Sequence, residues 1–211
     1  MFDNLRADVA SVLERDPAAK SKWEVLLCYP YVKAMAYHRI AHRQYQKGHT
    51  TVARWISQHA RHVTGIEIHP GAQIGKGFFI DHGNGVVIGE TTIIGDNVTV
   101  YQGVTLGGTG KDTGKRHPTI GNNVTIGAGA KVLGPVHIGD NTKIAAGAVV
   151  LREIPADSTA VGIPAKVVRK SGRRPDDLDQ IHIPDPVAQE LCRLRGEVEK
   201  LKEQLATTNK E

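Results

Sequence analysis

Residues 120–150 read IGNNVTIGAGAKVLGPVHIGDNTKIAAGAVV, and this stretch decides the fold. An aliphatic residue recurs at every sixth position, and a small or β-branched residue follows four positions later. A period of six residues is too long for a single strand and is out of phase with an α-helix. It fits a short strand and a tight turn that repeat around a coil, so that the aliphatic side chains of successive coils stack inside. The sequence therefore predicts a parallel β-helix.

The same repeat extends toward the N-terminus and is interrupted twice. Its aliphatic positions are Ile68, Ile74, Ile80, Ile88, Ile94, Val100, Leu106, Ile120, Ile126, Val132, Ile138, Ile144 and Val150. The step after Ile80 is eight residues long, and the step after Leu106 is fourteen. Insertions in a solenoid protrude from one face, which is often the binding face. Because both insertions carry a histidine and charged residues, we expect residues 81–85 and 107–118 to hold the chemistry.

The regions on either side of the repeat predict helices. Residues 1–65 have apolar residues at helical spacing and form an expected helical N-terminal domain, ahead of a β-helix catalytic domain at 66–168. Residues 161–166 are typical of a loop-like exit, and a Pro- and Asp-rich linker lies in the C-terminal region 169–211. That region ends in a heptad helix, whose apolar residues alternate four and three positions apart at Val187, Leu191, Leu194, Val198, Leu201 and Leu205. We expect an α+β protein whose last helix mediates self-association; the alternative is an amphipathic helix that docks on the body.

The composition excludes several classes of protein. Hydrophobic residues make up 40% of the chain and charged residues 23%, as in folded globular proteins. No apolar run approaches the ~20 residues of a membrane-spanning helix, and the N-terminus has no signal-peptide profile. The net charge of +5 includes no polybasic tail, so we expect neither a nucleic-acid nor a membrane partner. Cys28 and Cys192 have no metal-ligand spacing and form no disulfide framework, which favours a cytoplasmic protein.

Ten histidines raise the question of a metal site. The pairs His38/His42 and His59/His62 have helical ligand spacing, but no Glu joins them in an H-E-x-x-H motif. A β-helix can also hold zinc between subunits, as in the gamma-class carbonic anhydrases. This chain lacks the close histidine pair of such a site, so we expect no metal.

His82 is the strongest catalytic candidate, because it lies in the first insertion directly after Asp81. Glu67 precedes it by fifteen residues, nearly one coil, and residues stacked in neighbouring coils lie ~4.8 Å apart. We therefore expect Glu67 to contact the imidazole and fix its tautomer, which leaves the other ring nitrogen as a general base. A structural ion pair is the alternative interpretation of these two residues.

Six segments resemble the serine O-acetyltransferase family. They read EIHPGA (67–72), GFFIDHGNGVVIGET (77–91), QGVTLGGTG (102–110), RHPTIG (116–121), IGAGAKVLG (126–134) and VGIPAK (161–166). Asp16-Pro17-Ala18 also matches the helical domain of that family, so the resemblance covers roughly residues 15–168. It implies transfer of an acetyl group from acetyl-CoA to the hydroxyl of L-serine, which gives O-acetyl-L-serine and CoA on the route to cysteine. The repeat itself resembles the left-handed triangular coils of known hexapeptide families.

The resemblance implies a role for each residue at a matching position. His82 falls on the general base, and Glu67 falls where many relatives carry Asp. The serine-binding positions fall on Asp16, Asp81, Arg116 and His117. The positions near a CoA groove between subunits fall on Gly108, Thr109, Ala128, Lys143, Ala146 and Lys166.

These residue types suit the reaction. A serine hydroxyl is a poor nucleophile until a base removes its proton. Arg116 can bind a carboxylate with two hydrogen bonds, and the carboxylates of Asp16 and Asp81 suit an ammonium group. Backbone N–H groups at Gly107 and Gly108 can stabilise the thioester oxyanion. Acetyl-CoA is therefore the expected co-substrate, and we expect neither a metal nor a covalent acyl-enzyme.

The resemblance also implies partners. We expect a homotrimer, or a dimer of two trimers, with the active site between subunits. Many relatives end in an isoleucine that enters O-acetylserine sulfhydrylase. This chain ends at Thr208-Asn209-Lys210-Glu211, so we expect no such docking. Two alternatives stay open: a hexapeptide acetyltransferase for another hydroxyl acceptor such as a sugar, and a non-catalytic assembly solenoid.

Overall fold

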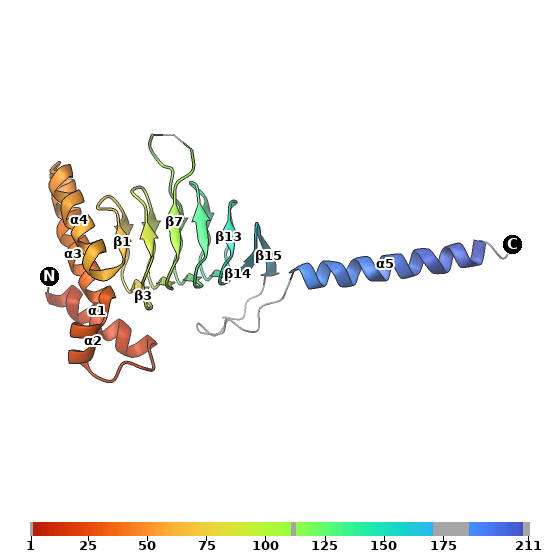
Figure 1. Ribbon diagram of the computed structural model, residues 1–211, viewed down its shortest axis with the longest axis horizontal. Helices are drawn as coiled ribbons and strands as arrows, with labels where there is room; N and C mark the ends of the chain where they lie inside the picture. The colour runs from red at the N-terminus through yellow and green to blue at the C-terminus, as the bar shows by residue number, and fades with distance from the viewer. Residues whose placement is uncertain (1, 111–112, 171–185, 209–211) are drawn as a thin grey trace.

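The computed structural model describes residues 2–110, 113–170 and 186–208. In these residues, four helices precede a long coil of short strands, and a single helix follows it (Figure 1). The helices are α1 (Phe2–Arg15), α2 (Lys22–Cys28), α3 (Pro30–Gln46), α4 (Thr50–Thr64) and α5 (Pro186–Thr208).

The strands between α4 and α5 are short, and most are two residues long. They are β1 (Glu67–Ile68), β2 (Gln73–Ile74), β3 (Phe79–Ile80), β4 (Val87–Ile88), β5 (Ile93–Ile94), β6 (Thr99–Val100), β7 (Thr105–Gly107), β8 (Thr119–Ile120), β9 (Thr125–Ile126), β10 (Lys131–Leu133), β11 (His137–Ile138), β12 (Lys143–Ile144), β13 (Val149–Val150), β14 (Ser158–Gly162) and β15 (Ala165–Lys170).

The strands form three sheets that the chain visits in turn. The first sheet has the order β1-β4-β7-β10-β13, the second β2-β5-β8-β11, and the third β3-β6-β9-β12-β14-β15. Neighbouring strands are parallel up to β14, and in an uninterrupted coil Lys131 pairs with Val149, eighteen residues or three repeats later. The parallel β-helix predicted from the six-residue period is confirmed. We call the turns from the first to the second sheet the first corner, from the second to the third the second corner, and from the third back to the first the third corner.

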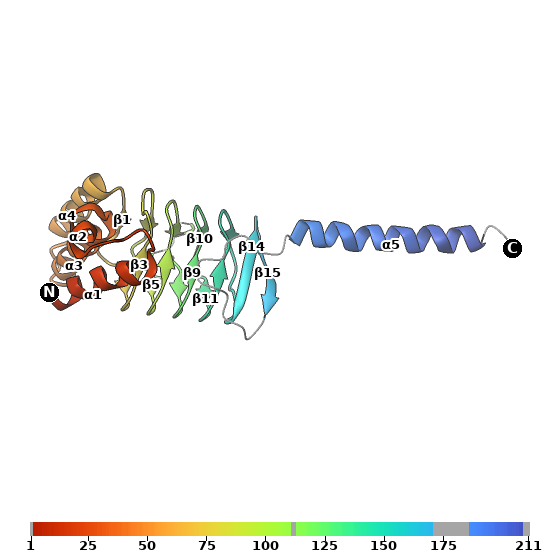
Figure 2. The same ribbon diagram turned by 90° about the horizontal axis from the view of Figure 1, so that it is seen from below.

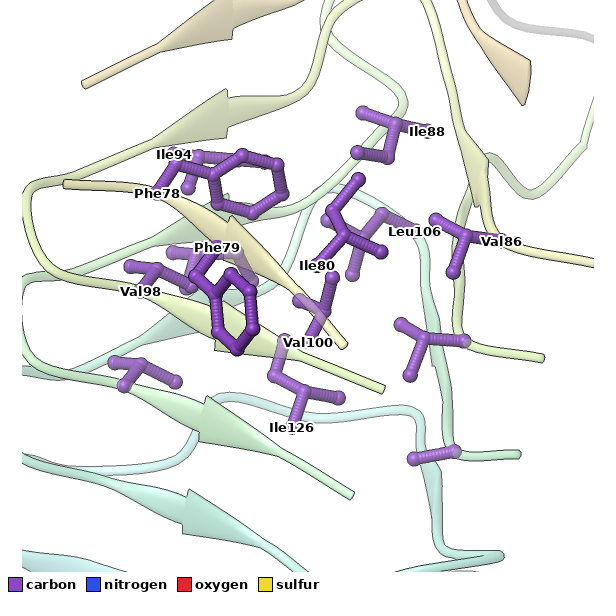
Figure 3. Packing of buried hydrophobic residues seen from close by; sticks show 14 of the residues in the cluster. Phe78, Phe79, Ile80, Val86, Ile88, Ile94, Val98, Val100, Leu106 and Ile126 are labelled. Atoms are coloured by element: carbon purple, nitrogen blue, oxygen red, sulfur yellow. The ribbon is translucent and has the colours of Figure 1, made fainter. Parts of the chain in front are cut away.

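The interior of the coil holds the aliphatic position of each repeat. Each of these residues is buried apart from Ile74, which is partly exposed. Ile80, Val100 and Ile126 pair in register on successive coils of the third sheet and stack within the core (Figure 3). A fully buried side chain of this size stabilises a fold by about 1.5–3 kcal/mol. The repeated aliphatic position is therefore the main source of cohesion along the coil.

Helices α1 to α4 lie at one end of the coil, and α5 extends away from the other end (Figures 1 and 2). Tyr31 of α3 packs edge-to-face on Phe79, with 5.6 Å between ring centroids, and its hydroxyl donates to the carbonyl oxygen of Phe78. Arg15 at the end of α1 donates from Nη1 to Oγ1 of Thr99 on β6, at 3.1 Å. These contacts hold the end of α1, and with it Asp16, against the third sheet.

The second corner is the most regular of the three. Asn97, Asn123, Asn141 and Asp157 occupy equivalent positions there, all with φ of 55–56°. Their side chains form a ladder in which Asn97 Nδ2 donates to Asn123 Oδ1 (3.4 Å), Asn123 to Asn141 (3.1 Å) and Asn141 to Asp157 (3.0 Å). Asn and Asp tolerate this left-handed conformation better than most residues, which explains their recurrence.

The end of the coil differs from the expected loop-like exit. Strands β14 and β15 form an antiparallel pair in which Val161 lies opposite Lys166, so the segment 161–166 belongs to a hairpin. Within this hairpin β15 pairs with the edge of β14, which would otherwise present unpaired backbone groups, and β15 becomes the last strand of the third sheet. The expected linker falls largely on residues 171–185, which lie outside the described residues. No helix in the described part of the chain is long and apolar enough to span a bilayer.

Candidate active site

The first insertion shapes an exposed turn at the third corner. His82 has φ of 58°, and its side chain is 78% exposed. Its Nε2 lies 4.0 Å from Oδ1 of Asp81, whose backbone N–H donates to the carbonyl of Val100 on the next coil. Gly83 follows because the backbone here lies directly on Ile66, where a Cβ would come within 2.6 Å of that side chain. The turn therefore presents the imidazole outward with a carboxylate beside it.

The segment after α1 brings a second carboxylate to this turn. Asp16 accepts a 2.6 Å hydrogen bond from the Tyr29 hydroxyl, and this bond is the main reason that the pKa of Tyr29 rises to about 12. Burial raises the pKa of Asp81 above its usual value, and repulsion from Asp16 raises it further, whereas His82 lowers it. Two carboxylates that repel each other beside an imidazole favour the binding of a cationic group. We call Asp16, Asp81 and His82 the His82 group.

A second cluster lies at the first corner, where the long insertion ends. Arg116 donates from Nη2 to Oε2 of Glu90 at 2.7 Å, and the Tyr45 hydroxyl of α3 donates to Oε1 at 2.9 Å. The hydrogen bond from Tyr45 is the largest cause that lowers the pKa of Glu90, and the Arg116 guanidinium also contributes. Glu90 therefore holds one edge of the guanidinium in place. We call Arg116, His117 and Glu90 the Arg116 group.

Thr91 fixes the orientation of His117. The backbone N–H of Thr91 donates to Nδ1 of His117 at 3.2 Å, and the Thr91 hydroxyl lies 2.9 Å from the same nitrogen. Because Nδ1 accepts a backbone hydrogen bond, a neutral ring carries its proton on Nε2. Burial lowers the pKa of His117, which favours that neutral form. Nε2 lies beside Gly108, where a Cβ would be 3.2 Å from it, and the ring lies so close to Gly89 that no Cβ could fit there.

Comparison with known proteins identifies the family. The family model described as bacterial transferase hexapeptide (six repeats) matches residues 117–152. The curated serine acetyltransferase of Synechococcus elongatus is 54% identical over 209 residues, which cover 99% of this chain and 86% of the relative. That of Bacillus licheniformis is 54% identical over 211 residues, or 100% of this chain and 98% of the relative. The chain belongs to the serine acetyltransferase family.

Solved serine acetyltransferase structures agree with the fold. The crystal structure from Neisseria gonorrhoeae has a TM-score of 0.79 and 43% identity, and the match covers 86% of this chain and 70% of that one. The serine acetyltransferase of Brucella abortus, solved in complex with coenzyme A, has a TM-score of 0.78 and 42% identity over 81% of this chain and 68% of that one. The expected left-handed β-helix with helices at its ends is thereby confirmed.

One geometric expectation for this serine acetyltransferase is wrong. Glu67 pairs in register with Val87, twenty residues later, because the first insertion lengthens this coil. Glu67 Oε2 lies 3.3 Å from Nε of Arg61 on α4, and no ion pair between Glu67 and His82 occurs among the described residues. A spacing of fifteen residues therefore does not stack Glu67 on His82, and Asp81 is the carboxylate beside the imidazole. A role for Glu67 in the reaction stays a prediction from the family resemblance.

The residues expected near CoA are distributed over two corners and the third sheet. Ala128 and Ala146 lie at the third corner, in line with the His82 turn, and the carbonyl of Ala128 accepts a 2.8 Å hydrogen bond from the Gly147 N–H. Gly108 and Thr109 are exposed at the first corner. The remaining two are Lys143, buried on β12, and Lys166, exposed on β15.

A single chain does not bring the expected serine-binding residues together. The His82 group lies at the third corner and the Arg116 group at the first, so they face different directions around the triangular coil. Sequence reasoning missed Tyr29, Tyr45, Glu90 and Thr91. Glu90 and Thr91 lie within a segment that carries the family resemblance, but Tyr45 on α3 and Tyr29 at the junction of α2 and α3 have no local signal. In the described residues, no three His, Cys, Asp or Glu side chains gather as a metal site.

Proposed function

We propose that His82 is the general base with which this serine acetyltransferase moves the acetyl group of acetyl-CoA to the hydroxyl of L-serine. The observation that carries this proposal is the exposed His82 imidazole, held in a left-handed turn beside Asp81. An exposed imidazole next to a carboxylate can accept a proton from a bound alcohol and return it later.

The reaction balances with His82 alone as the proton carrier. The imidazole takes the proton of the serine hydroxyl as the oxygen attacks the thioester carbonyl carbon. The C–S bond then breaks, and the imidazolium gives its proton to the departing sulfur, which leaves as the CoA thiol. The developing oxyanion is stabilised by backbone N–H groups at Gly107 and Gly108.

The ammonium and carboxylate groups of serine are bound by different residues. The ammonium group lies between the carboxylates of Asp16 and Asp81, where it relieves their repulsion. The carboxylate accepts hydrogen bonds from Arg116, whose guanidinium still has donors free of Glu90, and from Nε2 of His117. A crystal structure of the Neisseria gonorrhoeae relative is a complex with serine, which supports an amino-acid acceptor.

The separation of the two groups supports an active site between copies of the chain. Three copies whose coil axes run parallel can each offer the third corner to the first corner of the next copy. Such a head-to-tail contact closes into a ring, which favours the proposed homotrimer, or a dimer of two such trimers. Gly108, Thr109, Ala128, Lys143, Ala146 and Lys166 then border the groove for the acetyl-CoA co-substrate. The free Cys28 and Cys192 thiols and the use of acetyl-CoA support a cytoplasmic location.

The direct test is CoA thiol release from acetyl-CoA with L-serine, D-serine, homoserine or a galactoside as acceptor. We expect release that depends on L-serine, with little release from the other acceptors. Release that is independent of L-serine, or that is faster with the galactoside, would contradict the proposal.

A further inference from the structure

Helix α5 (Pro186–Thr208) presents an apolar stripe that is exposed in the described part of the chain. Leu191, Leu194, Val198 and Leu201 are 54%, 43%, 48% and 57% exposed. They follow the 3-4 spacing of heptad positions a and d, with Leu191 and Val198 at a and Leu194 and Leu201 at d. Figures 1 and 2 agree that α5 extends beyond the hairpin end of the coil, away from helices α1 to α4. Four large apolar side chains on one exposed face indicate a surface that another protein segment covers.

We propose that this segment is α5 of the neighbouring copies, in a parallel, in-register coiled coil that continues the β-helix. The first argument is geometric. Copies that pack side by side through the β-helix have their coil axes parallel, and each α5 then leaves the same end of the assembly in the same direction. When such helices are already parallel and close together, the a and d residues of one helix can pack against those of the next.

The charges beside the seam carry the second argument. Glu190 and Glu197 occupy g positions, which precede the a residues, and Arg195 and Lys202 occupy e positions, which follow the d residues. In a parallel pair, each g residue faces the e residue five positions later on the other helix. Glu190 then faces Arg195, and Glu197 faces Lys202, so both contacts join opposite charges. In an antiparallel pair g would face g and e would face e, which joins like charges.

Contacts within α5 are consistent with this arrangement. Arg193 at a c position donates to Glu190 at 2.7 Å and to Glu197 at 2.6 Å, which holds both g side chains along the flank of the seam. Gly196, the weak point for helix formation, occupies an f position on the opposite face. A Cβ placed there would meet nothing within 4 Å. The flexible residue therefore lies outside the proposed interface.

The proposal also explains how so short a seam can associate. Three heptads form only a marginal coiled coil between independent chains. When the β-helices already hold the chains together, association becomes intramolecular and its effective concentration is high. Self-association of α5 thus depends on an assembly of parallel β-helices, but not on the identity of the acceptor or of the general base.

The test is disulfide formation between a-position cysteines in the full-length protein. The variant is Leu191→Cys in a Cys28→Ser/Cys192→Ser background, which removes the two exposed native thiols. Gly196→Cys in the same background is the matched control, because its side chain would point outward. After mild oxidation we expect a large fraction of crosslinked dimer on denaturing gels for Leu191→Cys and several-fold less for Gly196→Cys. Equal crosslinking at both positions, or none at position 191, would overturn the proposal; an antiparallel pair or docking of α5 on another surface gives the latter result.

A charge exchange tests the register. In the Leu191→Cys background, Glu197→Lys and Lys202→Glu should each lower the crosslinked fraction several-fold, and the double variant should restore it. If the double variant is no better than either single variant, these residues do not face each other. All variants, when reduced, should keep the L-serine-dependent thiol release of the parent protein. A loss of that activity would concern the proposed catalytic function, whereas a loss of crosslinking alone concerns α5.

Discussion

The second corner and the third corner of the β-helix both place a non-glycine residue in the left-handed region, for different purposes. At the second corner, Asn97, Asn123 and Asn141 adopt φ near 55°, and their side chains bind one another along the coil. At the third corner, His82 adopts φ of 58°, but its side chain is left exposed. The turns themselves also differ, because the His82 turn contains Gly83 and Gly85 at positive φ, and Gly85 rather than His82 lies against Gly103 of the next coil.

The difference shows how a solenoid separates stability from chemistry. Where the repeat is perfect, equivalent side chains lie one coil apart and satisfy each other. Where two residues are inserted, as at 81–85, the coil length changes and no equivalent partner lies above or below. The side chain at the left-handed position is then free to act on a ligand.

His82→Ala should abolish most of the activity without unfolding the protein. Loss of a general base lowers kcat by about 10²–10⁴-fold, while the circular dichroism spectrum and oligomer mass should stay those of the parent protein. Steady-state thiol release measures kcat. The control is His137→Ala, an exposed histidine on β11 of the second sheet, which should keep normal activity. Near-normal turnover of His82→Ala would exclude His82 as the base.

Arg116→Ala should act mainly on serine binding. The loss of charge-assisted hydrogen bonds to the serine carboxylate should raise the KM for serine about 10- to 100-fold, with a smaller effect on kcat. Glu90→Gln should raise the same KM less, because it removes the anchor of the guanidinium and leaves its donors intact. The KM for acetyl-CoA serves as the internal control. An unchanged KM for serine in Arg116→Ala would remove this residue from the pocket.

Thr91→Val should lower activity through the orientation of His117. The variant loses the hydroxyl beside Nδ1 and the acceptor for the backbone N–H groups of Arg116 and His117. We expect kcat/KM for serine to fall about tenfold, the equivalent of one hydrogen bond. Thr91→Ser keeps the hydroxyl and should retain activity near that of the parent. If the serine variant is as impaired as the valine variant, the methyl group matters and the hydrogen bonds do not.

Asn123→Ala should change stability and leave catalysis intact. Alanine is less stable in the left-handed conformation and cannot form the side-chain hydrogen bonds of the ladder. Together these losses should lower the free energy of unfolding by roughly 1 kcal/mol. Asn123→Gly accepts the same φ and should lose less. Denaturant unfolding measures the first effect, and thiol release should be unchanged in both variants. A large loss of kcat in either variant would break the division between a structural corner and a catalytic one.

The sequence predicts the coil well because its information is local. The six-residue period places an aliphatic residue inside at every repeat, and each short strand and turn follows from neighbouring residues alone. The positions of the insertions at 81–85 and 107–118 were also predictable, since they break that period; their role as sites stays a prediction from His82 and His117. The prediction of a loop-like exit at 161–166 was wrong. Whether this segment forms a strand depends on the free edge of the preceding strand, which the local sequence does not specify.

Contacts between distant segments were less predictable. Glu67 was expected beside His82 because fifteen residues are nearly one coil, but an uninterrupted coil has eighteen residues and the insertion lengthens this one to twenty, so Glu67 pairs with Val87. Tyr45 reaches one group from α3, and Tyr29 reaches the other from the junction of α2 and α3, where packing around Tyr31 sets the position of α3 on the coil. No pattern within the helices themselves specifies such contacts.

The period, the aliphatic core and the candidate reactive side chains follow from the sequence, because each depends on residues close together in the chain. Only the tertiary structure decided which residues become neighbours across a coil, and that the His82 group and the Arg116 group occupy different corners. The physical reason is that neighbours across a coil are set by the number of residues in that coil, and this number varies: Glu67 pairs with Val87 twenty residues later, whereas Val87 pairs with Thr105 eighteen residues later. An insertion lengthens only the coils that contain it, and how its residues leave the coil is settled by packing against other segments, such as Ile66 beside Gly83.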